Sequence, residues 1–259
     1  MNSNNVILNA KNISITFGAL KAVTDFNLEI KENELVGLIG PNGAGKTTVF
    51  NILTGVYSPT SGEYIFNGEV VTKTPTHKLV KKGLARTFQN IRLFKNMTVL
   101  ENVLVANNFN MKYGILSGIF RFPNYWKEEK EAKEKALNLL KIFDLDKFAN
   151  TVAGNLPYGE QRKLEIARAM ATNPKLLLLD EPAAGMNPTE TEELMKTIKL
   201  IRDRFNIAIL LIEHDMKLVL GICEKLVVLD HGTTIASGDP MKVINNPTVI
   251  TAYLGQEEE

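Results

Sequence analysis

Apolar and polar positions follow three different patterns along the 259-residue chain. Residues 6–39 and 61–88 contain short apolar runs separated by turn residues, which is typical of strands. Residues 98–171 repeat apolar side chains at helical spacing, and residues 175–230 alternate short apolar runs with amphipathic segments. Alternating strands and helices favour right-handed crossovers and a mostly parallel sheet. The pattern therefore predicts an α/β core of mixed or parallel strands, with an N-terminal antiparallel β subdomain and an inserted α-helical subdomain.

The same pattern predicts the individual elements and how they are grouped within one domain. We expect the α/β core and β subdomain in residues 1–89 and 172–259, and the helical subdomain in residues 90–171. Predicted strands cover residues 6–8, 13–17, 26–30, 34–39, 63–66, 84–88, 175–180, 207–213 and 226–230. Predicted helices cover residues 47–54, 76–82, 126–143, 162–171, 188–204 and 216–223, and one more begins at a capping box formed by Thr98 and Glu101.

The charge balance argues against a nucleic-acid-binding protein. Thirty Lys and Arg residues against 29 Asp and Glu residues give a net charge of +1. The chain therefore lacks the basic field that draws proteins to nucleic acid, and we expect no such partner. Its hydrophobic content of 44% is enough to build a substantial core.

The apolar runs and the single cysteine indicate the compartment. The N-terminus has no basic segment followed by an apolar run, so no secretory signal is expected, and no apolar run approaches the roughly 20 residues of a spanning helix. Cys223 cannot form an internal disulfide, and its apolar neighbours predict a small buried side chain. We therefore expect a protein of the cytoplasm, with any membrane connection made through a partner.

A glycine-rich loop between a predicted strand and a predicted helix is the most informative stretch. Its glycines let backbone N–H groups turn inward around a phosphate, and the following helix adds its positive N-terminal end. Lys46 is expected to reach the terminal phosphates, and the Thr47 hydroxyl to ligate Mg²⁺. A chance glycine turn is the alternative, and the flanking strand and helix argue against it. The predicted nucleotide-binding residues are Gly40, Pro41, Asn42, Gly43, Ala44, Gly45, Lys46, Thr47 and Thr48.

Further candidates lie at the ends of two predicted strands. Asp180 and Glu181 follow a run of four leucines, at the strand end where α/β sheets bind ligands. Asp180 is suited to hold Mg²⁺ through water, and Glu181 to polarise or orient an attacking water. A helix-capping acidic pair is the alternative. His214 follows the apolar run 209–212 and is a candidate to hydrogen-bond a γ-phosphate, although a lone histidine is more often structural.

These motifs occur in the order typical of the ATP-binding cassette ATPases, and the chain resembles that family over essentially its whole length. Phe17 matches the aromatic residue that stacks on adenine, with a place in a strand core as its alternative. Gln89 matches the glutamine loop, which contacts Mg²⁺ and the transport partner, and His214 matches the switch histidine. Residues 184–187 match the loop that follows the carboxylates. The family signature corresponds to Leu156, Pro157, Tyr158, Gly159, Glu160 and Gln161.

The resemblance implies an ATPase that works as a head-to-tail dimer, because the signature of one subunit closes over ATP held by the other. Two departures from the family pattern matter. Pro157 removes a hydroxyl and an N–H and Tyr158 replaces a glycine, whereas Gly159 and the helix N-terminus still predict anion binding. Asn187 stands in place of an aspartate, which leaves the intersubunit role of this position open.

Longer matches resemble the larger ATPase subunit of branched-chain amino acid importers. They comprise residues 85–94, 181–188, 212–216 and 253–255, and an aromatic insertion at 112–126 that is either core or a docking surface. This resemblance implies a second similar ATPase, two membrane permeases, an external substrate-binding protein and a place on the cytoplasmic face of the cell membrane.

Four alternatives to an importer of branched-chain amino acids remain. Relatives with this type of ATPase also import amides or urea. Lipopolysaccharide export is disfavoured by the long helical region. A soluble cassette acting on DNA or ribosomes would need a long coiled coil or a second cassette. A regulatory module that does not hydrolyse ATP is disfavoured by the presence of Glu181 and His214.

Overall fold

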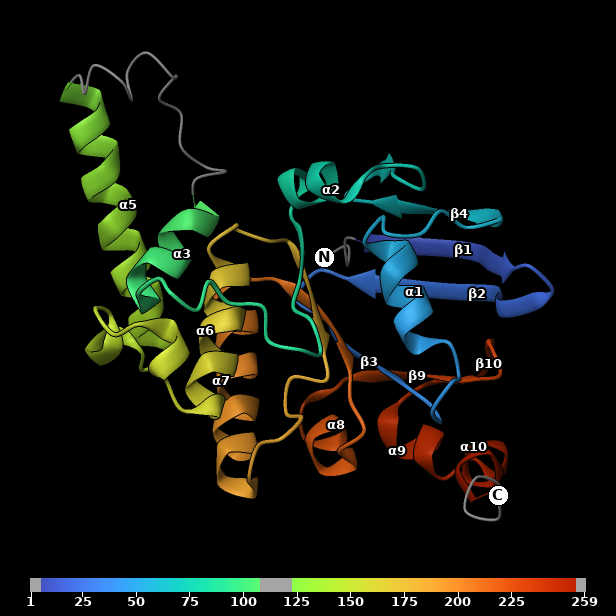
Figure 1. Ribbon diagram of the computed structural model, residues 1–259. Coiled ribbons are helices and arrows are strands. Elements are labelled where there is room, and N and C mark those ends of the chain that lie inside the picture. Colours follow the sequence, from blue (N-terminus) through green and yellow to red (C-terminus); the bar gives the residue numbers. More distant parts are fainter. Residues whose placement is uncertain (1–5, 108–122, 255–259) are drawn as a thin grey trace, which may run out of the picture. The chain divides into compact units, whose positions relative to one another are not determined.

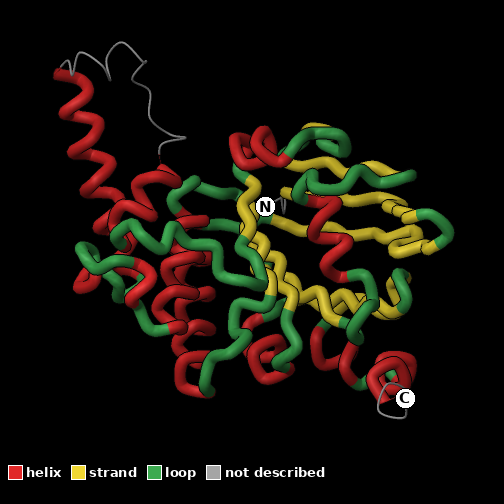
Figure 2. Tube along the Cα trace, viewed as in Figure 1, coloured by secondary structure: helices red, strands yellow, loops and turns green. Residues whose placement is uncertain are grey.

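The computed structural model describes residues 6–107 and 123–254, which form two compact units. The first, which we call the core unit, comprises residues up to 89 together with those from 175 onward. The second, the helical unit, comprises residues 90–174. Figure 2 shows the strands confined to the core unit. No helix among the described residues is long and apolar enough to cross a membrane.

A six-stranded sheet forms the centre of the core unit, in the order β10-β9-β3-β8-β7-β6. Its strands are β3 (Leu35–Ile39), β6 (Leu84–Arg86), β7 (Leu176–Asp180), β8 (Ala208–Ile212), β9 (Lys225–Asp230) and β10 (Thr233–Gly238). All pairs are parallel except β9 with β10. Every residue of β3, β7 and β8 is buried, which explains why these strands read as unbroken apolar runs in the sequence.

A second sheet is antiparallel, with four strands in the order β2-β1-β4-β5. Its strands are β1 (Val6–Phe17), β2 (Leu20–Lys31), β4 (Ser61–Phe66) and β5 (Glu69–Val70). The prediction of two short strands within residues 6–17 was wrong, because β1 is continuous. A register shift between Ala10 and Ile13, with Asn12 at a φ of +50°, interrupts the alternation of buried and exposed side chains that marks a strand in sequence.

Helix α1 (Lys46–Leu53) lies between the two sheets (Figure 1). Its buried side chains, Phe50 among them, join one hydrophobic cluster with residues of β1, β2, β3, β7 and β8. This cluster fixes the helix against the end of β3, and therefore fixes the glycine-rich loop that connects β3 to α1.

The other helices of the core unit are α2 (Thr76–Lys82), α7 (Pro188–Phe205), α8 (Met216–Ile222), α9 (Pro240–Ile244) and α10 (Pro247–Leu254). Asn187 caps α7: its side chain accepts from Glu190 N, and Glu190 Oε2 accepts from Asn187 N at 2.9 Å. Strand β10 and helices α9 and α10 were absent from the sequence prediction. They are short, and β10 is a half-exposed edge strand that contains small polar residues, so their periodicity is weak.

In its described part, the helical unit contains α3 (Val99–Asn107), α5 (Pro123–Ile142), α6 (Tyr158–Met170) and two short 3₁₀ segments, residues 146–148 and 153–155. The predicted capping box starts α3, because Thr98 N donates to Glu101 Oε2 at 2.7 Å and Glu101 N donates to Thr98 Oγ1 at 3.2 Å. Most of the predicted aromatic insertion, residues 112–122, lies outside the described residues.

Helix α6 begins at Tyr158, so the prediction that it starts at Arg162 was wrong. Pro157 occupies the N-cap, a position whose N–H has no partner within the helix, and its carbonyl accepts from Gln161 N at 3.0 Å. The proline that departs from the family pattern is therefore compatible with an early helix start.

Candidate functional site: an ATP-binding centre

The glycine-rich loop links β3 to α1 through a backbone that only glycine tolerates at two points. Gly40 has a φ of +149°, and a Cβ there would lie 2.0 Å from the Leu229 carbonyl oxygen. Gly45, the N-cap of α1, has a φ of +99°. Asn42, Gly43 and Thr47 are exposed, Gly45 and Thr48 are half-buried, and Gly40, Pro41, Ala44 and Lys46 are buried. The loop thus exposes its centre while both ends are packed into the core unit.

Lys46 points back into its own loop. Its Nζ donates to the carbonyl oxygens of Gly40 and Pro41 at 2.6 and 2.7 Å. Burial lowers the pKa of Lys46, while the negative charges of Glu181 and Asp180 act in the opposite direction. The lysine and the two carboxylates therefore share one electrostatic environment.

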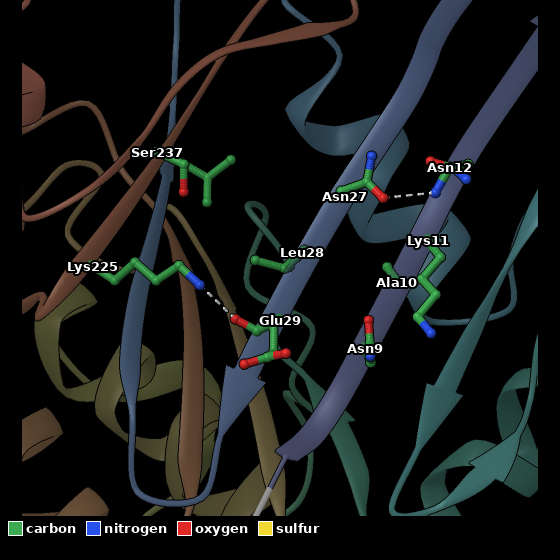
Figure 3. A pocket seen from close by; sticks show the side chains of 10 residues that line it. Asn9, Ala10, Lys11, Asn12, Asn27, Leu28, Glu29, Lys225 and Ser237 are labelled. Atoms are coloured by element: carbon green, nitrogen blue, oxygen red, sulfur yellow. Dashed lines mark hydrogen bonds between the residues drawn. The ribbon is translucent and has the colours of Figure 1, made fainter. Parts of the chain in front are cut away.

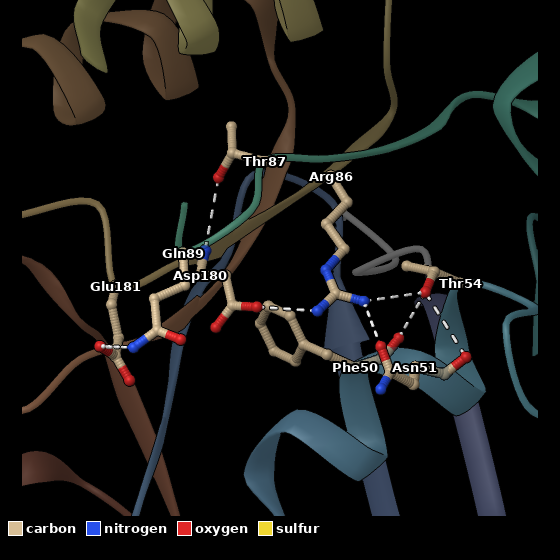
Figure 4. A network of polar contacts seen from close by, with 8 residues as sticks. All are labelled: Phe50, Asn51, Thr54, Arg86, Thr87, Gln89, Asp180 and Glu181. Atoms are coloured by element: carbon tan, nitrogen blue, oxygen red, sulfur yellow. Dashed lines mark hydrogen bonds and ion pairs between the residues drawn. The ribbon is translucent and has the colours of Figure 1, made fainter. Parts of the chain in front are cut away.

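Asp180 ends β7 and is deeply buried. Its Oδ2 accepts from Arg86 Nη2 at 2.7 Å, and the two side chains are only 6% and 8% exposed. The backbone N–H of Asp180 faces Thr87 Oγ1 at 3.4 Å (Figure 4). Sequence analysis did not identify Arg86 as a functional candidate. Its partner is 94 residues away along the chain, and no local pattern marks such a pair.

Glu181 is the point where three predicted site residues meet. Its Oε2 accepts from Gln89 Nε2 at 2.9 Å (Figure 4), and its Oε1 lies 3.1 Å from His214 Nε2. Its backbone has a φ of +47°, which is uncommon for a residue with a side chain and occurs preferentially at functional sites. The N–H of Glu181 donates to the Ile212 carbonyl at 2.9 Å, so pairing with β8 maintains this conformation.

Glu213 fixes the loops on either side of this site, a role that the sequence analysis missed. Its Oε1 accepts from Ala183 N at 2.7 Å, and its Oε2 accepts from His214 N at 3.1 Å. Burial raises the pKa of Glu213, and hydrogen bonds from the backbone of Ala183, His214 and Asp215 partly offset that effect. The only hint in the sequence is its place directly before His214.

Tyr253 reaches the glycine-rich loop from α10. Burial raises the pKa of its phenol, and a hydrogen bond from the backbone of Gly40 acts in the opposite direction. Residues 253–255 form the C-terminal motif that resembles branched-chain amino acid importers. Through Tyr253 this motif contacts the glycine-rich loop at Gly40.

Phe17 ends β1 and is 44% exposed. Its ring packs edge-to-face against Tyr57, with centroids 5.2 Å apart and planes at 71°. This exposure does not fit the alternative that Phe17 is a strand core residue.

The six signature residues belong to the helical unit, whereas all other predicted site residues belong to the core unit. Leu156 and Gly159 are buried, Glu160 and Gln161 are half-buried, and Pro157 and Tyr158 are exposed at the start of α6. Gln161 Nε2 donates to the Leu156 carbonyl at 2.8 Å, which stabilises the turn into the helix.

A shallow pocket between the β1–β2 hairpin and β9–β10 lies apart from these residues (Figure 3). Lys225 and Lys11 line it, and Lys225 Nζ donates to the Glu29 carbonyl at 2.8 Å. It contains none of the predicted site residues and is open, so its lining indicates no chemistry.

Comparison with known proteins identifies the family. A model of the ABC transporter family matches residues 23–184, and a model described as branched-chain amino acid ATP-binding cassette transporter matches residues 233–259. The high-affinity branched-chain amino acid transport ATP-binding protein BraF of Pseudomonas aeruginosa is 50% identical over 250 residues, which cover 96% of this chain and 98% of BraF.

Two solved structures extend the comparison. The ADP conformation of an ATP-binding cassette of an ABC transporter has a TM-score of 0.84 and 32% identity, and the match covers 96% of this chain and 99% of that one. A dimeric cassette in a post-hydrolysis state, bound to ADP and Pi, has a TM-score of 0.76 and 26% identity, covering 90% of this chain and 98% of that one. Because the family model spans more than half of the chain and BraF is half identical over nearly its full length, the chain belongs to the ABC transporter family, as an ATP-binding protein.

Proposed function

We propose that this chain is the ATP-hydrolysing subunit of an importer and powers the uptake of branched-chain amino acids through partner permeases. The observation that carries the hydrolytic role is the position of Glu181 between Gln89 and His214, directly after Asp180. The likeness to BraF and the match at residues 233–259 support the substrate class.

Glu181 is the proposed catalytic carboxylate. Gln89 and His214 contact its two oxygens in this structure, which aims the carboxylate at the shared site. In the reaction Glu181 is proposed to accept a proton from, or orient, a water that attacks the γ-phosphate. His214 and Gln89 are proposed to turn toward the γ-phosphate and the attacking water when ATP is present. His214 then acts through Nε2, the atom that contacts Glu181, whereas Gln89 offers Mg²⁺ its amide oxygen and not the Nε2 that contacts Glu181.

The loop from Gly40 to Thr48 is the proposed phosphate site. Lys46 exchanges the carbonyls of Gly40 and Pro41 for phosphate oxygens, which are stronger acceptors for an ammonium group. The backbone N–H groups at the exposed centre of the loop and the N-terminus of α1 add positive potential. Phe17, exposed at the end of β1, is proposed to stack on the adenine.

Mg²⁺ is the proposed metal, held by Thr47, Gln89 and Asp180. Among the described residues no group of three or more His, Cys, Asp or Glu side chains is able to hold a metal ion. A sparse set of one carboxylate, one hydroxyl and one amide suits Mg²⁺, which keeps several waters and takes further oxygens from substrate phosphates. When bound, the ion offsets negative charge on the phosphates.

The active form is proposed to be a dimer with a second, similar ATPase. Gln89, Asp180, Glu181 and His214 all lie in the core unit, whereas residues 156–161 lie in the helical unit, and the resemblance assigns those six residues to the ATP of the partner. The dimeric cassette with 26% identity supports this assembly. Gly159 and the start of α6 supply the anion-binding contact, and Pro157 occupies a position that needs no donor.

The remaining partners are proposed from the resemblance to branched-chain amino acid importers. They are two membrane permeases and an external substrate-binding protein, with this chain bound at the cytoplasmic face of the cell membrane. Asn187 caps α7 through Glu190, and we propose that this structural role replaces the intersubunit role of an aspartate.

Uptake by a reconstituted transporter tests the substrate. The assay uses vesicles that contain the purified chain, the two permeases, the second ATPase and the binding protein. These vesicles should take up labelled leucine only when ATP is present on the side of the membrane where the two ATPases lie. A matched assembly with Glu181→Gln should bind ATP but take up no leucine. Uptake of labelled urea without uptake of leucine would overturn the proposed substrate while leaving the ATPase role intact.

A further inference from the structure

Arg86 connects three elements that carry the proposed metal and phosphate ligands. Its Nη2 donates to Asp180 Oδ2 at 2.7 Å, and its Nη1 donates to Asn51 Oδ1 at 2.7 Å and contacts Thr54 Oγ1 at 3.3 Å (Figure 4). Arg86 ends β6, Asp180 ends β7, and Asn51 and Thr54 lie at the C-terminal end of α1. One guanidinium therefore joins two strands and a helix.

The surroundings of Arg86 favour a rigid, planar cation. The guanidinium carbon lies 5.4 Å from the centre of the Phe50 ring and 5.1 Å from that of Phe88. Contacts of this kind between a guanidinium and aromatic rings are attractive, and they restrict the side chain to one orientation. A lysine at this position would keep the charge but not the fork that reaches two separate acceptors.

The pairing also fixes the direction of the Asp180 carboxylate. Both side chains are almost completely buried, and a charge-assisted hydrogen bond of this kind holds a carboxylate in a definite direction. The ion pair uses Oδ2 alone, so Oδ1 does not take part in it.

We propose that Arg86 is a positioning residue for Mg²⁺: it holds the Asp180 carboxylate in one orientation, and it holds the helix that carries Thr47 at a constant distance from the strand that carries Asp180. Outer partners of metal-ligating side chains act in this way in other metal sites. The inference rests on the proposed function, because Thr47 and Asp180 are the proposed ligands.

The test measures the binding of a fluorescent ATP analogue to the purified full chain, with EDTA or with increasing Mg²⁺. In Arg86→Met, which keeps the length and loses the charge, the Mg²⁺ concentration for half-maximal enhancement of binding should rise by about tenfold or more. Binding in EDTA should change by less than about twofold, since the variant leaves the glycine-rich loop intact. In Arg86→Lys the half-maximal Mg²⁺ concentration should lie between those of the unmodified chain and Arg86→Met.

Two further variants separate positioning from a general loss of structure. Arg202→Met removes an arginine that pairs with Asp203 and Glu224 elsewhere in the core unit, and it should leave the Mg²⁺ dependence unchanged. In an Asp180→Asn background, Arg86→Met should have no additional effect on the Mg²⁺ dependence, because the ion pair through which Arg86 acts is already lost.

If Arg86→Met does not fold, Asn51→Ala provides the test of the positioning role, because it removes an acceptor of Arg86 without leaving a buried charge. It should raise the half-maximal Mg²⁺ concentration by about threefold. An unchanged Mg²⁺ dependence in the folded variant, or an equal loss of binding in EDTA, would overturn the inference. If nucleotide binding by the unmodified chain is itself indifferent to Mg²⁺, the proposed metal site fails and the role of Arg86 fails with it.

Discussion

His214 Nε2 lies 3.1 Å from Glu181 Oε1, and this contact joins the ends of the neighbouring parallel strands β7 and β8. Gln89, which follows β6, donates to the other oxygen of the same carboxylate. Three adjacent strands therefore each deliver one side chain to a single point at their carboxyl ends, where α/β sheets bind ligands.

Glu181→Gln should separate ATP binding from hydrolysis. The amide is nearly the same size but cannot accept a proton, so we expect kcat to fall by about a hundredfold or more while ATP affinity stays within about twofold. Steady-state hydrolysis and equilibrium binding measure the two quantities. Glu192→Gln, the same change at an exposed ion pair with Lys217, is the control and should retain full activity. Undiminished turnover in Glu181→Gln would remove the carboxylate from the proposed mechanism.

Lys46→Ala should weaken ATP binding by more than about tenfold, because charge-assisted hydrogen bonds to phosphate are lost. Inorganic tripolyphosphate, which has no adenine, should compete with ATP for the unmodified chain, and its affinity should fall by the same factor in Lys46→Ala. Lys225→Ala removes another lysine that donates to backbone and should bind ATP normally. Equal affinities for the Lys46 and Lys225 variants would contradict the assignment of the phosphate site.

Asn187→Ala should lower the free energy of unfolding by about 1 kcal/mol, because it removes the side chain that caps α7. Asn187→Asp should leave stability unchanged, since aspartate caps a helix equally well. Urea denaturation measures both. If alanine is neutral, the hydrogen bond between Asn187 and Glu190 contributes little to stability, and the reason for an asparagine at this position must lie elsewhere.

Gly40→Ala and Gly43→Ala form a matched pair within one loop. A Cβ at residue 40 meets the Leu229 carbonyl at 2.0 Å, whereas one at residue 43 meets nothing within 4 Å. We expect the first change to lower the free energy of unfolding by more than about 3 kcal/mol. The second should cost about 1–2 kcal/mol, because Gly43 has a φ of +77°. Similar losses in the two variants would show that backbone conformation alone determines the effect.

Cys223 should be almost inert in the folded protein. Burial raises the pKa of its thiol to about 12, so the reactive thiolate is a fraction on the order of 10⁻⁴ at pH 8. Raising the pH toward that value increases the thiolate fraction about tenfold per unit. Labelling with a maleimide should therefore be about a thousandfold slower in native buffer than in urea, and should speed up with pH. Equal rates in both would mean that the thiol is accessible without unfolding.

Local sequence was sufficient to predict most of the residues that the structure brings together around Glu181 and the glycine-rich loop. Glycines before Lys46 dictate a loop that turns around an anion, and leucines before Asp180 dictate a buried strand whose end must face the ligand. The same reasoning failed for β1, where a register shift at Asn12 breaks the period on which strand prediction depends. It also failed for the start of α6, because a proline reads as a helix breaker although it suits the N-terminus.

By itself, the sequence determined the glycine-rich loop, most of the helices and strands of the core, and the pair of carboxylates at a strand end, because each depends on residues that are close together in the chain. Only the tertiary structure decided that Arg86 pairs with Asp180 and that Glu213 holds the loop at Ala183. These contacts join residues 94 and 30 positions apart. Their geometry depends on which strands lie side by side in the sheet, and this strand order follows from packing of the whole core rather than from any local pattern.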